Sequence, residues 1–390
     1  MRQADRGDTM ELPTEEKLLD VVEEFTVPQQ SEAYQASYRR WRRRKNNRYA
    51  FCFSKNMKEA TFAENQAVVN ETPAQAENFA LHSLGILFAW ALMLYLVIEN
   101  VIDKIVVLIA QYMGVRIEMV YWGESRYYGE DQVVFLFTAA LQILKILVPI
   151  LVIGLALRMS LRTSVPCRVR NKRYFLTGVS AVMLLSVVLG IAFVSRSAEL
   201  EKYRLISEVN RSEDHWVIIY ILFTVFIAPL FSELLFHGAM FQSLRQFGDR
   251  FAIGAVAILS ALLAHNPHDA LRLGLLTLLI SFFMVRTGSF LTAVIMRIIH
   301  EIYMFAMFQI ESYGGMFSVY WWFVVLFPVV VGLLNVVAIV LNRGEKEEYR
   351  AENPSYMTIW DQATAFFTSI PMLIMLVTCV LLIVVTFMLG

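Results

Sequence analysis

Several ionisable side chains that could perform acid–base or metal chemistry lie inside long apolar stretches of this chain. They are Glu233, His237, His265, Arg297, His300 and Glu301. Four of the six histidines fall between residues 237 and 300. Carboxylates and imidazoles act as general bases and as zinc ligands. Because a charge at bilayer depth costs several kcal/mol, such residues are functional candidates by default.

The spacing of these residues predicts that they share faces and a common depth. Glu233 and His237 are four residues apart, as are Arg297 and Glu301, so each pair lies on one face of a helix. Counted from the nearest basic residue at 1.5 Å per residue, Glu233 lies about 18 Å deep, His265 about 22 Å and Arg297 about 16 Å. Three helices are therefore expected to turn polar groups toward one cavity.

Composition places these helices in a membrane. The 390 residues are 57% hydrophobic and 17% charged, with a mean hydropathy of +0.53, which excludes an ordinary soluble protein. A net charge of zero argues against a nucleic-acid-binding protein. Three widely separated cysteines do not form a disulfide framework or a zinc–thiolate pattern. The expected fold class is all-α, a polytopic transmembrane helical bundle.

Apolar windows of about 20 residues recur after residue 80 and predict about nine spans. They run over residues 83–99, 132–157, 174–194, 216–244, 251–265, 270–285, 288–310, 320–341 and 366–389. The fifth and sixth windows are short. The predicted organisation is a cytoplasmic N-terminal region (1–80), three transmembrane helices (81–215), a motif-bearing core (216–310) and C-terminal transmembrane helices (311–390).

The distribution of basic residues predicts the orientation. The block from Arg39 to Lys45 holds five arginines and a lysine, which resist translocation and attract anionic lipid headgroups. We therefore place the N-terminus in the cytoplasm, the C-terminus outside, and the protein in the plasma membrane, with membrane lipid as a partner. The connections that follow the second, fourth, sixth and eighth spans carry basic residues, as this orientation requires.

The region of the buried charges resembles the CAAX-protease and bacteriocin-processing (CPBP) family. Residues 228–238 read APLFSELLFHG and resemble the family motif P-x-x-E-E-x-x-F-R-G. Residues 261–265 correspond to its F-x-x-x-H motif, and residues 286–289 read RTGS before the position of an H-x-x-x-N motif at Arg297 and Glu301. The resemblance covers about residues 216–310. It implies an intramembrane endopeptidase core with a cytosol-facing cavity and a membrane-associated or lipidated peptide or protein as partner.

The sequence departs from the family at positions that matter for hydrolysis. Ser232 replaces the first glutamate, His237 the arginine, Arg297 the second histidine and Glu301 the asparagine. Among the polar motif positions, only Glu233 and His265 match. A guanidinium stays protonated and cannot bind a cation, so Arg297 would repel a metal ion at the position where the family motif supplies a ligand. We expect Arg297 to pair with Glu233 or Glu301 instead.

Three readings of the polar residues remain open. In the first, the protein binds a membrane-associated peptide or protein and its catalysis is impaired, with Ser232, His237, His300 and Glu301 lining the binding site. In the second, a rearranged endopeptidase site uses Glu233, His265 and Arg297 as catalytic residues. Arg297 then stabilises the oxyanion, and Glu233, His237 and His265 form a set suited to zinc. In the third, the charges are structural ion pairs.

Two other expectations concern the rest of the charge pattern. Lys145 is expected to be a structural residue that snorkels or pairs locally.

A transporter is a fourth possibility, but the two halves of the sequence show no convincing repeat and no paired interrupted helices. Measurement of bound zinc separates the enzyme from a scaffold that binds a partner.

Overall fold

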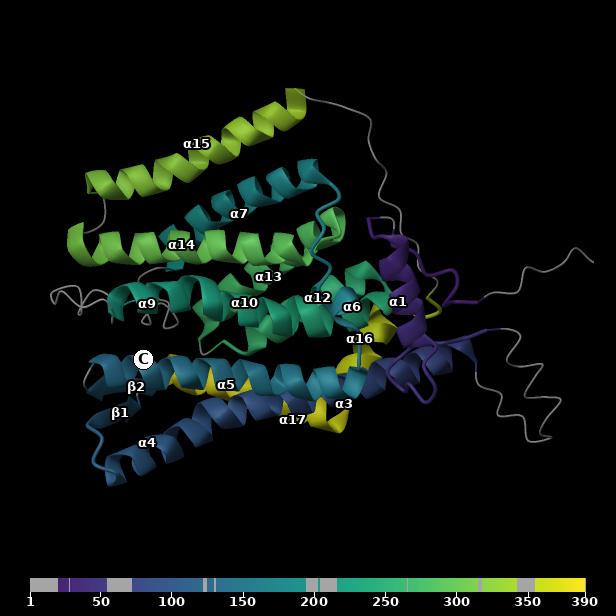
Figure 1. Cartoon of the computed structure of the whole chain (residues 1–390), viewed down its shortest axis with the longest axis horizontal. Coiled ribbons are helices and arrows are strands. Elements are labelled where there is room, and N and C mark those ends of the chain that lie inside the picture. The colour runs from purple at the N-terminus through teal and green to yellow at the C-terminus, as the bar shows by residue number, and fades with distance from the viewer. Residues whose placement is uncertain are drawn as a thin grey trace, which may run out of the picture.

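The computed structural model of the chain shows a bundle of long helices whose axes run in roughly the same direction (Figure 1). It describes residues 20–27, 29–54, 72–121, 125–129, 131–193, 203, 216–264, 266–314, 318–341 and 355–389. One antiparallel hairpin, β1 (Ile117–Tyr121) and β2 (Ser125–Gly129), is the sheet in these ranges. The predicted all-α polytopic fold is confirmed.

The helical elements follow in chain order. They are α1 (Glu32–Arg42), α3 (Pro73–Val97), η1 (Ile98–Ile102), α4 (Asp103–Tyr112), α5 (Asp131–Leu157), α6 (Leu161–Ser164), α7 (Lys172–Phe193), α9 (Trp216–Leu222), η3 (Phe223–Ile227), α10 (Ala228–Glu233), η4 (Leu234–Met240), α11 (Phe241–Leu244), η5 (Arg245–Phe247), α12 (Asp249–Leu262), α13 (Pro267–Thr287), α14 (Phe290–Gly314), α15 (Val319–Leu341), α16 (Ile359–Phe367) and α17 (Ile370–Leu389).

Within the described residues, eight helical runs are long and apolar enough to cross a membrane. The difference from the predicted nine lies at α12. This helix has 14 residues and is about 21 Å long, which is short of the roughly 30 Å hydrocarbon core. It packs beside α13 as one arm of a hairpin. The predicted fifth window therefore forms a helix that turns back inside the bundle.

Local sequence signals start and end the helices next to the site. Asn266 caps α13 by accepting a hydrogen bond from the Asp269 backbone N–H, and Pro267 occupies the first turn, where its missing N–H is harmless. Gly288 ends α13 with φ +67°, a left-handed conformation that favours glycine. A Cβ at Gly288 would lie 2.4 Å from the Gln29 carbonyl oxygen, so the N-terminal segment packs directly on this turn.

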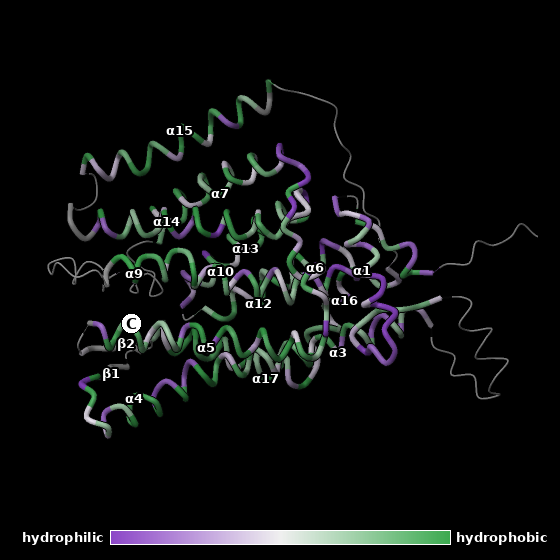
Figure 2. The backbone as a smooth tube through the Cα atoms, viewed as in Figure 1, coloured by the Kyte–Doolittle hydropathy of each residue, from purple (hydrophilic) through white to green (hydrophobic). Residues whose placement is uncertain are grey.

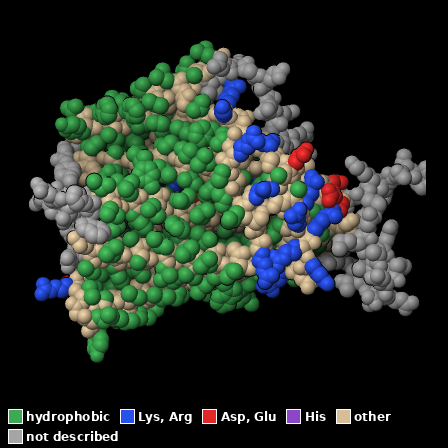
Figure 3. All heavy atoms as spheres, viewed as in Figure 1, with side chains coloured by type: hydrophobic (Ala, Val, Ile, Leu, Met, Phe, Trp, Pro, Cys, Tyr) green, Lys and Arg blue, Asp and Glu red, His purple; other side chains and the backbone are tan. Residues whose placement is uncertain are grey.

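The surface divides into an apolar belt and a basic end. Hydrophobic residues dominate the length of the spans, and hydrophilic residues gather near α1 (Figure 2). In the view of Figure 3, most of the visible Lys and Arg side chains gather at that same end of the molecule, beyond the broad hydrophobic surface. This distribution fits an integral membrane protein whose two ends face different compartments. The C-terminus lies at the end of the bundle opposite α1 (Figure 1).

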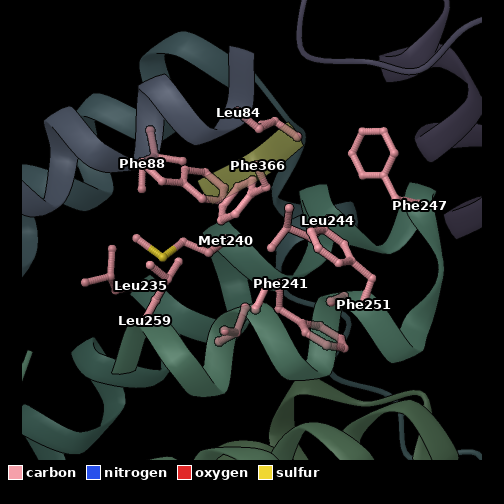
Figure 4. Close-up of a cluster of buried hydrophobic side chains, with 14 of the residues drawn as sticks. Leu84, Phe88, Leu235, Met240, Phe241, Leu244, Phe247, Phe251, Leu259 and Phe366 are labelled. Carbon is pink, nitrogen blue, oxygen red and sulfur yellow. The ribbon is translucent and has the colours of Figure 1, made fainter. Parts of the chain in front are cut away.

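A hydrophobic core joins helices from distant parts of the sequence near this basic end. Phe366 of α16 packs edge-on against Phe88 of α3 and Phe251 of α12, with both ring centroids 5.9 Å away (Figure 4). Gly85 permits this approach, because a Cβ there would lie 2.3 Å from the Phe366 carbonyl oxygen. The core therefore depends on a small residue in α3.

The N-terminal segment is docked on the bundle. The hydroxyl of Tyr34 donates to the Gln242 side-chain carbonyl (2.8 Å), and that of Tyr38 donates to the Gln242 backbone carbonyl (2.7 Å). The indole of Trp41 donates to the Leu157 carbonyl (2.8 Å). Burial raises the pKa of Tyr34 to about 12, so its hydroxyl remains a donor at neutral pH.

Part of the basic block is structural. Arg42 is buried and donates to the carbonyls of Phe51 and Val21, with its guanidinium 5.5 Å from the centre of the Phe25 ring. Burial lowers the pKa of Arg42 to about 10, which still leaves it charged at neutral pH. The side chains of Arg40, Arg43, Arg44 and Lys45 are exposed. Arg43 is paired with Asp20 (2.5 Å) and Glu23 (3.0 Å), so the other three are the exposed cations of the block that remain for the predicted contact with anionic lipid.

We predict that Arg42→Met lowers the stability of the docked segment by about 3 kcal/mol, because two buried carbonyls lose their donor. The thermal unfolding midpoint in detergent and the rate of limited proteolysis within residues 20–54 report the change. Arg44→Met is the matched control and should stay within about 0.5 kcal/mol of the parent, since Arg44 is exposed. Equal losses in both variants would contradict the structural role of Arg42.

Candidate functional site

Glu233 and His237 lie at a change of helical geometry in the span that contains α9, α10 and α11. Glu233 ends α10, and the seven-residue π-helix η4 begins at Leu234. A π-helix has more residues per turn than an α-helix because its hydrogen bonds close i→i+5 rings. Residues four apart then lie more directly above one another, which brings Glu233 and His237 together. Such π segments occur frequently at functional sites.

The side chains of Glu233 and His237 form a buried pair. His237 Nδ1 lies 2.5 Å from Glu233 Oε2, and the two side chains are 1% and 4% exposed. Neither atom has a hydrogen-bond partner among the described residues, so this is a close polar contact without hydrogen-bond geometry.

A third side chain completes this group from another helix. Ser281 of α13 is fully buried, and its Oγ lies 2.8 Å from His237 Nε2. The same Oγ lies 2.7 Å from the Thr277 carbonyl one turn earlier in α13. Both imidazole nitrogens of His237 therefore contact protein atoms. We call Glu233, His237 and Ser281 the carboxylate–imidazole group.

Arg297 and Glu301 form a second buried pair on α14. Arg297 Nη2 lies 2.9 Å from Glu301 Oε1, and Glu301 is fully buried. The hydroxyl of Tyr203 donates to Glu301 Oε2 at 2.5 Å, and the Tyr203 ring packs against Phe305 and Phe308. Of the two partners predicted for Arg297, the structure shows Glu301. The pair is close to neutral, as burial in a bilayer requires.

His300 belongs to a third buried group between α7, α13 and α14. His300 Nδ1 lies 2.9 Å from Ser186 Oγ, and His300 Nε2 lies 3.2 Å from Arg272 Nη1. Arg272 forms an ion pair with Asp269 at 3.2 Å, and Asn266 Nδ2 donates to the same carboxylate at 2.8 Å. His300 is thus tied to the packing of three helices.

We predict that Glu301→Leu lowers stability by about 3 kcal/mol, because it removes the carboxylate nearest to a buried guanidinium. The double variant Arg297→Leu/Glu301→Leu should recover most of the loss, since an apolar pair of similar volume replaces an ion pair at little net change. The midpoint of thermal unfolding in detergent measures both. A double variant as unstable as the sum of the two single variants would show that Arg297 and Glu301 do not interact.

The remaining predicted residues divide as follows. Ser232 is half-buried, directly before Glu233. His265 lies outside the described residues, so its catalytic and ligand roles stay predictions. Lys145 forms an ion pair with Glu99 and lies 5.2 Å from the centre of the Tyr95 ring. That local pair agrees with the structural role expected for Lys145.

Sequence reasoning missed the polar partners that neighbouring helices supply. They are Ser186, Asn266, Asp269, Arg272 and Ser281. A partial signal was present, because residues 266, 269 and 272 are three apart and predict one polar helix face. No comparable signal identifies Ser281, whose role depends on the way α13 faces η4.

The predicted zinc ligands do not fit a metal as Glu233 and His237 stand. Zinc–nitrogen and zinc–oxygen bonds of about 2.0–2.2 Å place the ligand atoms of a tetrahedral site roughly 3.3–3.6 Å apart. His237 Nδ1 and Glu233 Oε2, at 2.5 Å, are too close together to be two such ligands. His237 Nε2 already contacts Ser281. Among the residues that the structure describes, no three His, Cys, Asp or Glu side chains come together as a metal site. A set that includes His265 stays a prediction.

Comparison with known proteins locates the family in this region. Residues 214–303 match the family model described as Type II CAAX prenyl endopeptidase Rce1-like. The match contains Glu233, His237, Ser281 and Arg297, and it confirms the resemblance predicted for about residues 216–310. No curated protein and no solved structure matches the chain. Residues 214–303 are thus similar to the Rce1-like proteins of the CAAX-protease (CPBP) family.

Proposed function

We propose that this protein binds a membrane-associated or lipidated peptide or protein through its Rce1-like core, and that its ability to hydrolyse peptide bonds is impaired. The observation that carries the proposal is the Arg297–Glu301 pair, 2.9 Å apart, at the position of a family motif that supplies a histidine and an asparagine. A neutral imidazole can bind a metal or accept a proton, whereas a guanidinium paired with a carboxylate can do neither.

The contacts and the burial of Glu233 also argue for impaired hydrolysis. One carboxylate oxygen contacts His237 at 2.5 Å, in a group that is almost completely buried. Water activation requires a base within hydrogen-bond reach of a water molecule, or a metal that lowers the pKa of that water. The first motif glutamate, which would stand beside Glu233, is Ser232 and has no carboxylate. These features argue against hydrolysis.

The class of partner is inferred from the depth of Glu233 and Arg297 in the bundle and from the match to the Rce1-like family model. Glu233 and Arg297 lie within helices long enough to span a bilayer, so a ligand that reaches them must tolerate an apolar environment. A lipidated or hydrophobic peptide satisfies this condition. We place the entry at the end that carries α1 and the exposed arginines, with that end in the cytosol, the protein in the plasma membrane, and anionic lipid around it.

We predict that a farnesylated peptide carrying a benzophenone crosslinks to residues 216–310 of the full chain in nanodiscs. Glu233→Gln should reduce the yield about tenfold, because a charged acceptor worth about 1.5–3 kcal/mol becomes a neutral amide. Glu32→Gln, an exposed change on α1, should leave the yield unchanged. Crosslinks that map elsewhere, or that persist in Glu233→Gln, would contradict the proposed binding site.

An active endopeptidase with a rearranged site is the second candidate. The 2.5 Å contact between Glu233 and His237 favours it, because a carboxylate beside an imidazole is a common acid–base arrangement. In this candidate Glu233 is the base or a metal ligand, and His237 and His265 are metal ligands or the acid. Arg297 stabilises the oxyanion, and zinc is the predicted cofactor if His265 joins Glu233 and His237. Zinc when bound would lower the pKa of a water molecule.

We predict that Ser232→Glu combined with Arg297→His raises cleavage of a lipidated fluorogenic peptide above the level of the parent protein, because the double change restores two motif positions. Ser232→Gln with Arg297→Gln is the matched control and should not cleave. Cleavage by the parent protein that disappears in Glu233→Gln would instead support the second candidate. Bound zinc that is lost in His265→Ala would support its metal-dependent form.

A further inference from the structure

We propose that Ser281 is a positioning residue that fixes the proton positions of the carboxylate–imidazole group. In this arrangement Ser281 Oγ donates its proton to the Thr277 carbonyl and accepts the Nε2–H of His237. The distances are 2.7 Å and 2.8 Å. A serine hydroxyl has one proton to donate, so both contacts are satisfied only when His237 Nε2 carries a proton.

A second serine in the same bundle shows the same geometry with its proton positions fixed. Ser186 Oγ lies 2.7 Å from the Val182 carbonyl one turn earlier and 2.9 Å from His300 Nδ1. Arg272 contacts His300 Nε2, and because arginine only donates, that nitrogen must accept. The proton of His300 is therefore on Nδ1, so Ser186 must accept it and donate to Val182.

The same reasoning applies at His237. If Ser281 donated to Nε2 instead, its 2.7 Å contact with the Thr277 carbonyl would hold no proton. A proton on His237 Nε2 satisfies both contacts of Ser281.

This arrangement assigns the reactive atom of the group. Nε2 of His237 is held by Ser281, and Nδ1 is held against Glu233 Oε2. Glu233 Oε1, the oxygen that does not contact His237 Nδ1, is the acceptor that a bound peptide N–H or amine would use. This last step rests on the proposed binding function, whereas the role of Ser281 does not.

Nitrogen-15 NMR of the full chain, labelled at histidine and reconstituted in lipid, tests the proton positions directly. The resonance assigned to His237 by its loss in His237→Gln should show a protonated Nε2. Ser281→Ala should shift that resonance, because the N–H loses its acceptor, and Ser281→Thr should retain it. Ser186→Ala is the matched control, which should shift the His300 resonance and leave that of His237 in place.

Three results would overturn the proposal. The first is an unprotonated Nε2 of His237 in the parent protein, a measurement that does not depend on how any Ser281 variant folds. The second is a folded Ser281→Ala protein whose His237 resonance is unchanged. The third is covalent labelling of Ser281 by a fluorophosphonate, because a nucleophilic serine must donate its proton to the imidazole. Failure of peptide crosslinking with the expected NMR result would overturn the binding function alone.

Discussion

A bilayer interior does not solvate charge, and this constraint organises the polar residues of the protein. Each buried ionisable group discussed above has an opposite charge or a hydrogen-bond partner nearby. Glu233 contacts His237, Arg297 contacts Glu301, and Arg272 contacts Asp269. Because breaking a buried pair is far more destabilising than replacing it, these pairs limit which sequences keep the fold. The same pairs also determine which polar atoms remain available to contact a ligand.

The helices that carry these pairs pack against one another, and the pairs make separate contacts. α14 carries both Arg297 with Glu301 and His300, and α13 supplies Ser281 to one group and Arg272 to another. The short helix α12 packs on α13 and forms the other arm of the hairpin. At one end of the bundle, α1 is hydrogen-bonded to Gln242, five residues after His237. The N-terminal segment is therefore part of the structure around the core and is more than a membrane-binding arm.

The periodicity of the sequence predicted the structural features that depend on one helix alone. The long spans, the shared face of Arg297 and Glu301, and the shared face of Glu233 and His237 follow from hydropathy and from residues four apart. The length of α12 could not be read in this way, because its apolar window continues past the turn that ends it. The π-helical geometry of η4 was not visible either, since it arises where the packing of neighbouring helices accommodates an extra residue.

Contacts between helices were the least predictable part of the site. Ser281 has an ordinary sequence environment, and its importance depends on α13 facing η4. The burial of Arg42 in the N-terminal segment likewise depends on Phe25 and Phe51, which flank it from both sides in the sequence. A cluster of arginines predicts attraction to lipid, but it does not predict which member turns inward. Identification of those residues required the three-dimensional arrangement.

We propose that the site consists of two separate pairs, Glu233 with His237 and Arg297 with Glu301, and that Arg297 stands where the family motif has a histidine. A cryo-electron microscopy map of the protein in nanodiscs, at a resolution that shows side chains, tests it most directly. We expect density for Glu233 against His237 and for Arg297 against Glu301, as two distinct contacts. Direct pairing of Glu233 with Arg297, or a metal ion held by Glu233, His237 and His265, would contradict this account.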